Sequence, residues 1–261
     1  MVIRLRVAGA SDVGPHRAVN QDAAFTASWG AAVADGVGGG PSGDLASAAL
    51  VHRLVPSAGI QVTGPRLVER LREANWDLRA LVERDASLTG MATTFTGVFV
   101  SEDGGLLLAH SGDSRAYRLR DGELVRLSRD DSYVQALVDN GVIAPEEAQN
   151  HPKRNIITAS FGGAERDLPA VSALDVAPGD RLLLCSDGLT DYVPEADVLT
   201  LVQRGGVVEA AQALVNLAIE ASTRDNVTAI VCDIDEGAPD DDEPIFLGSA
   251  AERFNESLES A

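Results

Sequence analysis

The sequence contains little cysteine, little histidine and few aromatic residues, and each shortage excludes a class of protein. Its 261 residues include two cysteines, Cys185 and Cys232, and four histidines. These numbers exclude a disulfide framework and argue against a zinc cage of cysteine and histidine ligands. Both cysteines stand in apolar runs, so we expect them to be buried in strands of a cytoplasmic protein. Aromatic residues make up only 4%, so the core must consist of alanine, valine, leucine and isoleucine.

Long hydrophobic runs and excess positive charge are also missing. No stretch approaches the ~18 apolar residues of a membrane span, and the N-terminal MVIRLRVAGAS is too short and polar for a signal peptide. We therefore expect no membrane span. The net charge is −19, from 40 acids and 21 bases. Such a field repels nucleic acids and anionic membranes and favours divalent cations and basic partners, so we expect no nucleic-acid binding.

The length suits one large domain, and its apolar runs alternate with turn sequences. Strands are predicted at 4–11, 23–28, 31–35, 93–101, 106–112, 114–120, 123–128, 180–187 and 226–234. The four runs between 93 and 128 look like one antiparallel meander. Helices are predicted at 42–55 (capped by Ser42), 65–85, 131–140, from Pro145, at 195–204 and at 206–221.

Strands with two helices inserted early and two late indicate a sheet sandwich flanked by helices, rather than a doubly wound parallel sheet. We place this domain at 1–234. The stretch that follows is acidic and contains proline and glycine, so we interpret 235–261 as a linker and C-terminal tail, with a short amphipathic helix over 245–260.

Four aspartates stand in turns beside apolar strands. Asp35, Asp113 and Asp187 each follow a strand, and Asp225 precedes one. A carboxylate at a strand end is held rigidly yet reaches solvent, which suits hard cations such as Mg²⁺ or Mn²⁺. Each turn alone is an ordinary Asp-Gly or Asp-Asn turn, and only the four together favour a metal site.

The segment from Asp35 to Gly43, DGVGGGPSG, leaves a second interpretation open. Gly38, Gly40 and Gly43 match the GxGxxG pattern of a dinucleotide site between a strand and a helix. No acid lies between Leu45 and Val68, where the ribose-binding carboxylate would fall, and this disfavours an organic cofactor. The glycines more plausibly let the backbone bend around a metal.

In their order and spacing, these segments resemble the bacterial form of the type 2C family of metal-dependent protein phosphatases, the PPM family. The resemblance runs from Ser11 to about Val231, over SDVGPHRAVNQDA, VADGVGGGPSGDLAS, TTFTG, HSGDSRAYRL, DDSYVQALVDNGVIAPEEAQNHPKRNIIT, LLLCSDGLTD and RDNVTAIV. It implies an α+β fold, a four-layer α-β-β-α sandwich of two antiparallel sheets flanked by helices. It also implies hydrolysis of phosphoserine and phosphothreonine by a metal-activated water, which reverses serine/threonine kinase signalling.

The resemblance implies roles for the aspartates. Asp35 resembles the residue that bridges two catalytic Mn²⁺ or Mg²⁺ ions, with the Gly36 carbonyl on one of them. Asp187 and Asp225 resemble the other carboxylates of that centre. Asp113 resembles the ligand of a third, more weakly held ion.

Other residues resemble the substrate-handling parts of the family. Asp22 resembles the acid that orients a metal-bound water, and Arg17 resembles the clamp on the substrate phosphate. Residues 129–155 resemble the flap over the site. Within it, Lys153 and Arg154 either meet the protein substrate or close the flap, or are simply solvated.

The sequence departs from the family at two places. Many eukaryotic members have a histidine, proposed as general acid, where this chain has Val37, so the proton donor is unassigned and His16 is a weak candidate. The usual Gly-Thr-Thr begins here with Ala92. Two alternatives remain: a pseudophosphatase that only binds phosphoproteins, and a phosphatase specific for an anti-anti-sigma-type regulator. We expect a monomer whose partners are a serine/threonine kinase and its phosphorylated substrates.

Overall fold

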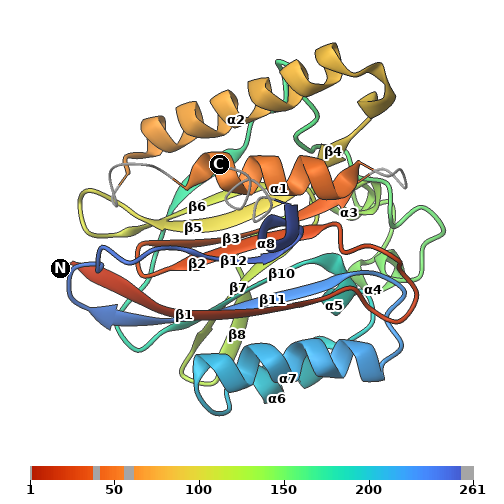
Figure 1. Ribbon diagram of the computed structural model, residues 1–261. Helices are drawn as coiled ribbons and strands as arrows, with labels where there is room; N and C mark the ends of the chain where they lie inside the picture. Colours follow the sequence, from red (N-terminus) through yellow and green to blue (C-terminus); the bar gives the residue numbers. More distant parts are fainter. Residues whose placement is uncertain (1, 38–41, 56–61, 254–261) are drawn as a thin grey trace.

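The structure, a computed structural model, describes residues 2–37, 42–55 and 62–253. Two antiparallel sheets pack face to face, and helices cover the outer face of each (Figure 1). This is the predicted four-layer α-β-β-α sandwich. Gly38 and Gly40, from the GxGxxG match, lie outside the described residues.

The smaller sheet has five strands in the order β1-β11-β10-β7-β8. Their bounds are β1 Ile3–Asp12, β7 Arg115–Arg120, β8 Glu123–Arg126, β10 Arg181–Cys185 and β11 Val227–Glu236. The first and last long strands lie side by side at one edge of this sheet, since β1 pairs with β11 along its whole length from Ile3↔Glu236 to Asp12↔Val227.

The larger sheet has seven strands, in the order β12-β2-β3-β5-β6-β9 with β4 paired to β3. Their bounds are β2 Asp22–Ala27, β3 Gly30–Val37, β4 Ala92–Thr93, β5 Phe95–Val100, β6 Leu106–Ser111, β9 Ala170–Leu174 and β12 Ile245–Gly248. Of these, β4 extends the predicted 93–101 strand at its start, whereas β9 was not predicted. Every ladder between the described strands of both sheets is antiparallel, so the parallel βαβ unit of a dinucleotide fold is absent from the described chain.

The larger sheet is covered by α1 Gly43–Leu54 and α2 Gly64–Arg84, and the smaller by α6 Glu195–Val202 and α7 Val207–Glu220 (Figure 1). Four short helices and one 3₁₀ turn complete the fold: α3 Tyr133–Asp139, α4 Pro145–Ala148, α5 Asp187–Thr190, α8 Ser249–Arg253 and η1 Ala86–Leu88. None of the described helices combines the length and apolarity that a bilayer crossing requires.

Side chains alternate between two apolar layers along each central strand. On β10, Leu182 and Leu184 face the other sheet, while Leu183 and Cys185 face α7. Because successive side chains of a strand point to opposite faces, the continuous apolar run of β10 fills the space between the sheets and the space under the helices at once. Cys185 and Cys232 are buried and unbonded to each other, as predicted.

Five buried aromatic residues lie together in one layer of the core. Phe25, Trp29, Phe95, Phe99 and Phe161 all lie between the larger sheet and its helices. Their rings contact one another with centroid separations of 5.4–6.4 Å. The layer between the two sheets is built from alanine, valine, leucine, isoleucine and cysteine.

The predicted meander over 93–128 is wrong in one respect. The strands β5 and β6 pair within the larger sheet, whereas β7 and β8 belong to the smaller sheet. The chain crosses between sheets after Ser111, where Gly112 adopts a φ of 110° that favours glycine. Local turn signals do not reveal this because a hairpin turn and a sheet-to-sheet crossing use the same residues.

Two further predictions, the Ser42 cap and the helix from residue 245, are wrong. Ser42 precedes α1 but its side chain makes no capping hydrogen bond, whereas Thr63 caps α2 through the Arg66 N–H. Residues 245–248, expected to begin a helix, form β12, because the edge of the larger sheet offers β2 as a pairing partner. Residues 245–253, which we set apart as tail, therefore lie on the domain.

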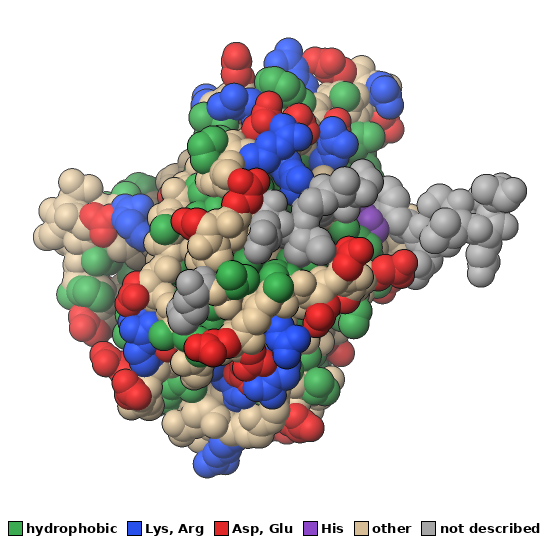
Figure 2. Space-filling view, turned by 90° about the vertical axis from the view of Figure 1, so that its left-hand side faces the viewer, with side chains coloured by type: hydrophobic (Ala, Val, Ile, Leu, Met, Phe, Trp, Pro, Cys, Tyr) green, Lys and Arg blue, Asp and Glu red, His purple; other side chains and the backbone are tan. Residues whose placement is uncertain are grey.

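The surface carries charges of both signs. On the face shown in Figure 2, acidic side chains are scattered, and basic ones gather towards the top, at the height of α2. The acidic excess is not one continuous patch on this side.

Candidate metal centre

The sandwich brings five aspartates together at one end of the two sheets. Asp22 and Asp35 face each other across the β2–β3 ladder. Asp187 lies two residues after the end of β10, and Asp225 lies two residues before the start of β11. Asp113 lies in the crossing from β6 to β7. Both sheets therefore contribute carboxylates, from segments up to about 200 residues apart in the chain.

Burial and repulsion from neighbouring carboxylates make Asp35 and Asp187 hard to ionise. The pKa of Asp35 is raised well above its ordinary value, first by burial and then by the charges of Asp22, Asp187, Asp225 and Asp113. The pKa of Asp187 is raised in the same way, with burial again the largest cause. A cluster of this kind is stable in its charged form only if cations neutralise it.

One carboxylate oxygen of Asp22 is hydrogen-bonded and the other has no partner. Its Oδ2 accepts hydrogen bonds from Ser186 Oγ and Thr228 Oγ1, both at 2.7 Å. Its Oδ1 is buried without a partner. Burial raises the pKa of Asp22 to about 6, although the two hydroxyl bonds lower it. The hydroxyls therefore fix the carboxylate so that one oxygen stays available.

Asp113 shares this character at the edge of the site. Burial raises its pKa to about 7, and the nearby charges of Asp130 and Asp191 add to the shift. Its Oδ1 is buried without a partner.

Unpartnered carboxylate oxygens test whether the residues suit a metal ion. The buried Oδ1 atoms of Asp22, Asp113 and Asp187 all lack a hydrogen-bond partner. Hard divalent cations prefer such oxygens, so the donor set fits Mg²⁺ or Mn²⁺. Within the described ranges no three acidic, imidazole or thiolate groups stand as a ready-made site. Binding would therefore require the carboxylates to rotate.

Arg17 is bound to Asp225. Its Nη2 donates to Asp225 Oδ2 at 2.7 Å, and its Nε donates to the Arg224 carbonyl at 3.2 Å. The guanidinium is partly exposed, with 41% of the side chain accessible. It therefore stands at the mouth of the aspartate cluster, in contact with one of the candidate ligands.

The loop that carries Arg17 is fastened to the start of β11. The φ of Gly14 is +72°, and a Cβ there would lie 2.3 Å from the Asp225 carbonyl oxygen. Only glycine allows this close approach. Asn226, next to Asp225, donates to the carbonyls of Val13 and Val19 and accepts from the Gln21 N–H.

Gly36 is packed against backbone on two sides. A Cβ at this position would lie 2.4 Å from the Gly43 carbonyl carbon and oxygen, and 2.8 Å from the Gln21 carbonyl oxygen. The Gly36 N–H donates to that Gln21 oxygen at 3.2 Å. Close packing of this kind holds the backbone beside Asp35 in one position.

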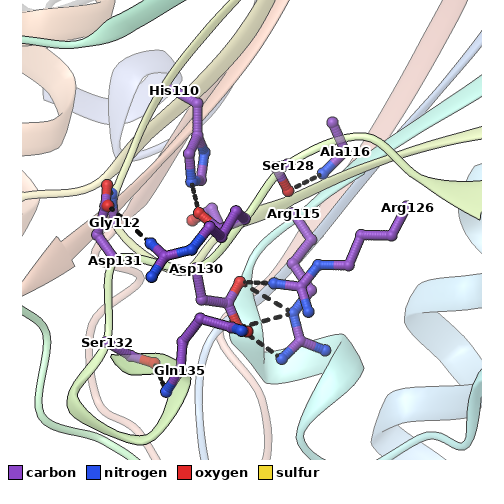
Figure 3. A network of polar contacts seen from close by, with 12 residues as sticks. His110, Gly112, Arg115, Ala116, Arg126, Ser128, Asp130, Asp131, Ser132 and Gln135 are labelled. Carbon is purple, nitrogen blue, oxygen red and sulfur yellow. Dashed lines mark hydrogen bonds and ion pairs between the residues drawn. The ribbon is translucent and has the colours of Figure 1, made fainter. Parts of the chain in front are cut away.

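A cavity of about 580 Å³ extends from Asp113 and Asp187 to the segment expected to be the flap. One wall carries Arg115 and Arg126, which share the carboxylate of Asp130 (Figure 3). The side chains of Ser132, Val134 and Gln135 from the start of α3, among others, line the opposite side.

The segment 129–155 contains α3 and α4 and is closed at its base. The Tyr133 N–H donates to the Ile156 carbonyl at 2.8 Å. Arg154 donates to Asp191 at 3.3 Å, and Lys153 lies over the Tyr133 ring at 5.2 Å. Arg154 thus connects this segment to Asp191 at the end of α5, whereas Lys153 contacts a residue of the segment itself.

Sequence reasoning assigned no role to several residues that the structure places here. Ser186 and Thr228 hold Asp22, and Asp191 lies one helical turn after Asp187 with a pKa raised chiefly by burial. The signal for Asp191 was its spacing of four residues on one helix face. His16 is exposed beside Arg17, and Val37 ends β3.

Comparison with known proteins gives a consistent family. The family model described as Protein phosphatase 2C matches residues 16–216. The serine/threonine protein phosphatase PstP of Mycobacterium tuberculosis is 39% identical over 251 residues, covering 95% of this chain and 48% of PstP. This chain thus spans about half the length of PstP. The serine/threonine phosphatase stp of Listeria innocua is 32% identical over 208 residues, covering 76% of this chain and 82% of that protein.

Solved structures agree. The catalytic domain of PstP, in complex with two manganese ions, has a TM-score of 0.80 and 39% identity and covers 90% of this chain and 100% of that one. The phosphatase MsPP of Mycobacterium smegmatis, in complex with cacodylate, has a TM-score of 0.80 and 36% identity, covering 87% and 97%.

Proposed function

This chain belongs to the protein phosphatase 2C family, and on that basis we propose that it hydrolyses phosphoserine and phosphothreonine in proteins with the help of Mn²⁺ or Mg²⁺. One observation carries the proposal beyond family membership. Burial raises the pKa values of Asp22, Asp35, Asp113 and Asp187, and all but Asp35 have a buried carboxylate oxygen without a partner. Such a cluster requires cations. The phosphatase domain would span 1–234 together with the docked residues 245–253, with the flap at 129–155.

The residues have distinct tasks in this proposal. Asp35, the Gly36 carbonyl, Asp187 and Asp225 hold two ions, and Asp113 holds a third, weaker one. When bound, the ions supply a Lewis-acid centre that lowers the pKa of water and offsets phosphoryl charge. Asp22 has one free oxygen in a fixed position, which suits it to orient the attacking water.

Arg17 would orient the substrate phosphate. It uses two of its five N–H groups on the 224–225 segment, which leaves donors for a phosphate at the mouth of the site. A bidentate grip from this direction places the phosphorus over the aspartate cluster for in-line attack. The flanking peptide would lie along the cavity under the flap.

The proposal extends to the substrates, the compartment and the oligomeric state of the protein. The substrates would be phosphorylated proteins of a serine/threonine kinase pathway, including the kinase, and the protein would act in the cytoplasm as a monomer.

Hydrolysis of a phosphothreonine peptide and of a chromogenic phosphate ester tests the proposal. The wild type should require Mn²⁺ or Mg²⁺ and lose activity in EDTA. Asp35→Ala, Asp187→Ala and Asp225→Ala should each lower the rate by at least about a hundredfold. Asp85→Ala, at an exposed acid beyond the end of α2, is the matched control and should keep full activity.

Near-normal activity in the three site variants would refute the assignment. A wild type that binds the phosphopeptide but does not hydrolyse it with either metal would instead be a phosphoprotein-binding pseudophosphatase.

A further inference from the structure

Nine residues near the end of the chain dock beside the metal centre. Residues 245–253, named here the C-terminal strap, comprise β12 and α8. The strand β12 adds to the edge of β2 and ends with Gly248 opposite Ala23. There Gly248 has a φ of +60°, and a Cβ would lie 2.2 Å from the Asp22 carbonyl oxygen. The strap therefore turns directly against the backbone of Asp22.

Two buried serine hydroxyls connect the strap to the site. Ser249 Oγ donates to the Asp22 carbonyl at 3.0 Å and lies 3.0 Å from Ser47 Oγ. Ser47 Oγ in turn donates to the Gln21 carbonyl at 2.6 Å. Gly36 donates its N–H to the same Gln21 oxygen. The contacts thus run from the strap to the backbone of Asp22 and of Gly36.

The strap also contacts both ends of α1. Arg253 Nε donates to Asp44 Oδ2 at 2.7 Å, in the first turn of α1. The His52 ring stacks on Phe246 with centroids 4.0 Å apart, and its Nε2 bonds to the Ala250 carbonyl at 2.7 Å. Arg253 thus holds the start of α1, whose Gly43 packs against Gly36, and His52 connects the last turn of α1 to the strap.

We propose that the C-terminal strap positions the metal centre, with Ser249 as a positioning residue that holds the Gln21–Asp22 backbone in place against Gly36. The proposal rests on the metal-dependent function proposed above. Metal affinity depends on groups behind the ligands, because a ligand fixed in advance loses little freedom on binding. Ser249 touches no candidate ligand oxygen and acts only through backbone, so its loss should weaken metal binding rather than the chemistry.

The test compares two serine variants of the full chain. Ser249→Ala removes the hydroxyl beside Asp22. Ser28→Ala is the matched control, because Ser28 is also a buried hydroxyl and also fastens the C-terminal region, through the Asp240 carbonyl and Asp242. Ser28 follows the end of β2 opposite to Asp22, and its hydroxyl bonds to the 240–242 segment. Titration calorimetry with Mn²⁺ gives the dissociation constant, and a melting curve without metal gives stability.

Ser249→Ala should raise the Mn²⁺ dissociation constant about fivefold, the factor that corresponds to roughly 1 kcal/mol for one hydrogen bond. The rate at saturating Mn²⁺ should stay within about twofold of wild type. Ser28→Ala should lower the melting temperature by about as much as Ser249→Ala does. It should leave the Mn²⁺ dissociation constant unchanged. Arg253→Gln, which loosens the outer end of the strap, should raise the constant by a smaller factor.

An unchanged constant in Ser249→Ala would overturn the strap proposal alone, provided that the wild type binds Mn²⁺ and hydrolyses phosphopeptide. An equal rise in Ser28→Ala would also overturn it, because general loosening would then explain the effect. A wild type that binds no Mn²⁺ would refute the proposed function together with the strap.

Discussion

Asp113→Asn should stabilise the metal-free protein while removing a candidate metal ligand. The pKa of Asp113 is raised from 3.8 to about 7, chiefly by burial. Because the folded-state pKa is the higher one, the unfolded chain ionises first as the pH rises. Folding therefore loses stability between about pH 4 and pH 7, and the full loss is present above pH 7. Asparagine has the same shape and carries no charge, so it avoids this loss.

The size of the effect follows from the pKa difference. Three pKa units correspond to roughly 4 kcal/mol. Asp113 is only partly covered by protein, and solvent screening should reduce this to about 2 kcal/mol. For a chain of this length, about 2 kcal/mol raises the melting temperature by roughly 4–8 °C at pH 8. At pH 5 the gain should fall to about 2 °C, because a folded Asp113 is then protonated.

The assay is thermal unfolding in EDTA at pH 5 and pH 8, with Asp85→Asn as the control. Hydrogen bonds from Ser87 lower the pKa of Asp85, so its replacement should not stabilise the protein at either pH. No stabilisation of Asp113→Asn at pH 8, or equal stabilisation at both pH values, would contradict the argument.

Three other substitutions test single positions. Gly36→Ala should abolish Mn²⁺ binding in calorimetry, because its Cβ would overlap the Gly43 carbonyl; normal binding would show that the loop can shift. Arg17→Lys should raise the KM for a phosphopeptide about tenfold, since lysine lacks the planar fork, and should leave Mn²⁺ affinity nearly unchanged. An unchanged KM would remove Arg17 from phosphate binding. His16→Gln should leave the pH–rate profile unaltered, because the side chain is exposed; loss of one limb of that profile would identify His16 as the proton donor.

Much of the fold was readable from local pattern. The apolar run at 180–187 predicted β10, and the helix predicted at 65–85 matches α2, which has Pro65 in its first turn. The pairing of strands was less accessible. Nothing local distinguishes the crossing at Gly112 from a hairpin turn, so β5–β6 and β7–β8 appeared to be one meander. The short strand β9 is largely exposed and lacks alternation, so it gave no signal.

The candidate site, like the fold, has features that the sequence predicts and others that only the tertiary structure shows. By itself, the sequence determined the residue types and their order: aspartates at strand ends, an arginine near the start, and the family pattern that joins them. That is possible because a rigid carboxylate needs only its own strand and turn, which are local. Only the tertiary structure decided that Arg17 contacts Asp225, that Ser186 and Thr228 hold Asp22, and that 245–253 docks on Asp22 rather than trailing as a tail. These contacts join segments about 160 to 230 residues apart, and their energy comes from burial and hydrogen-bond pairing that exist only after both sheets have formed.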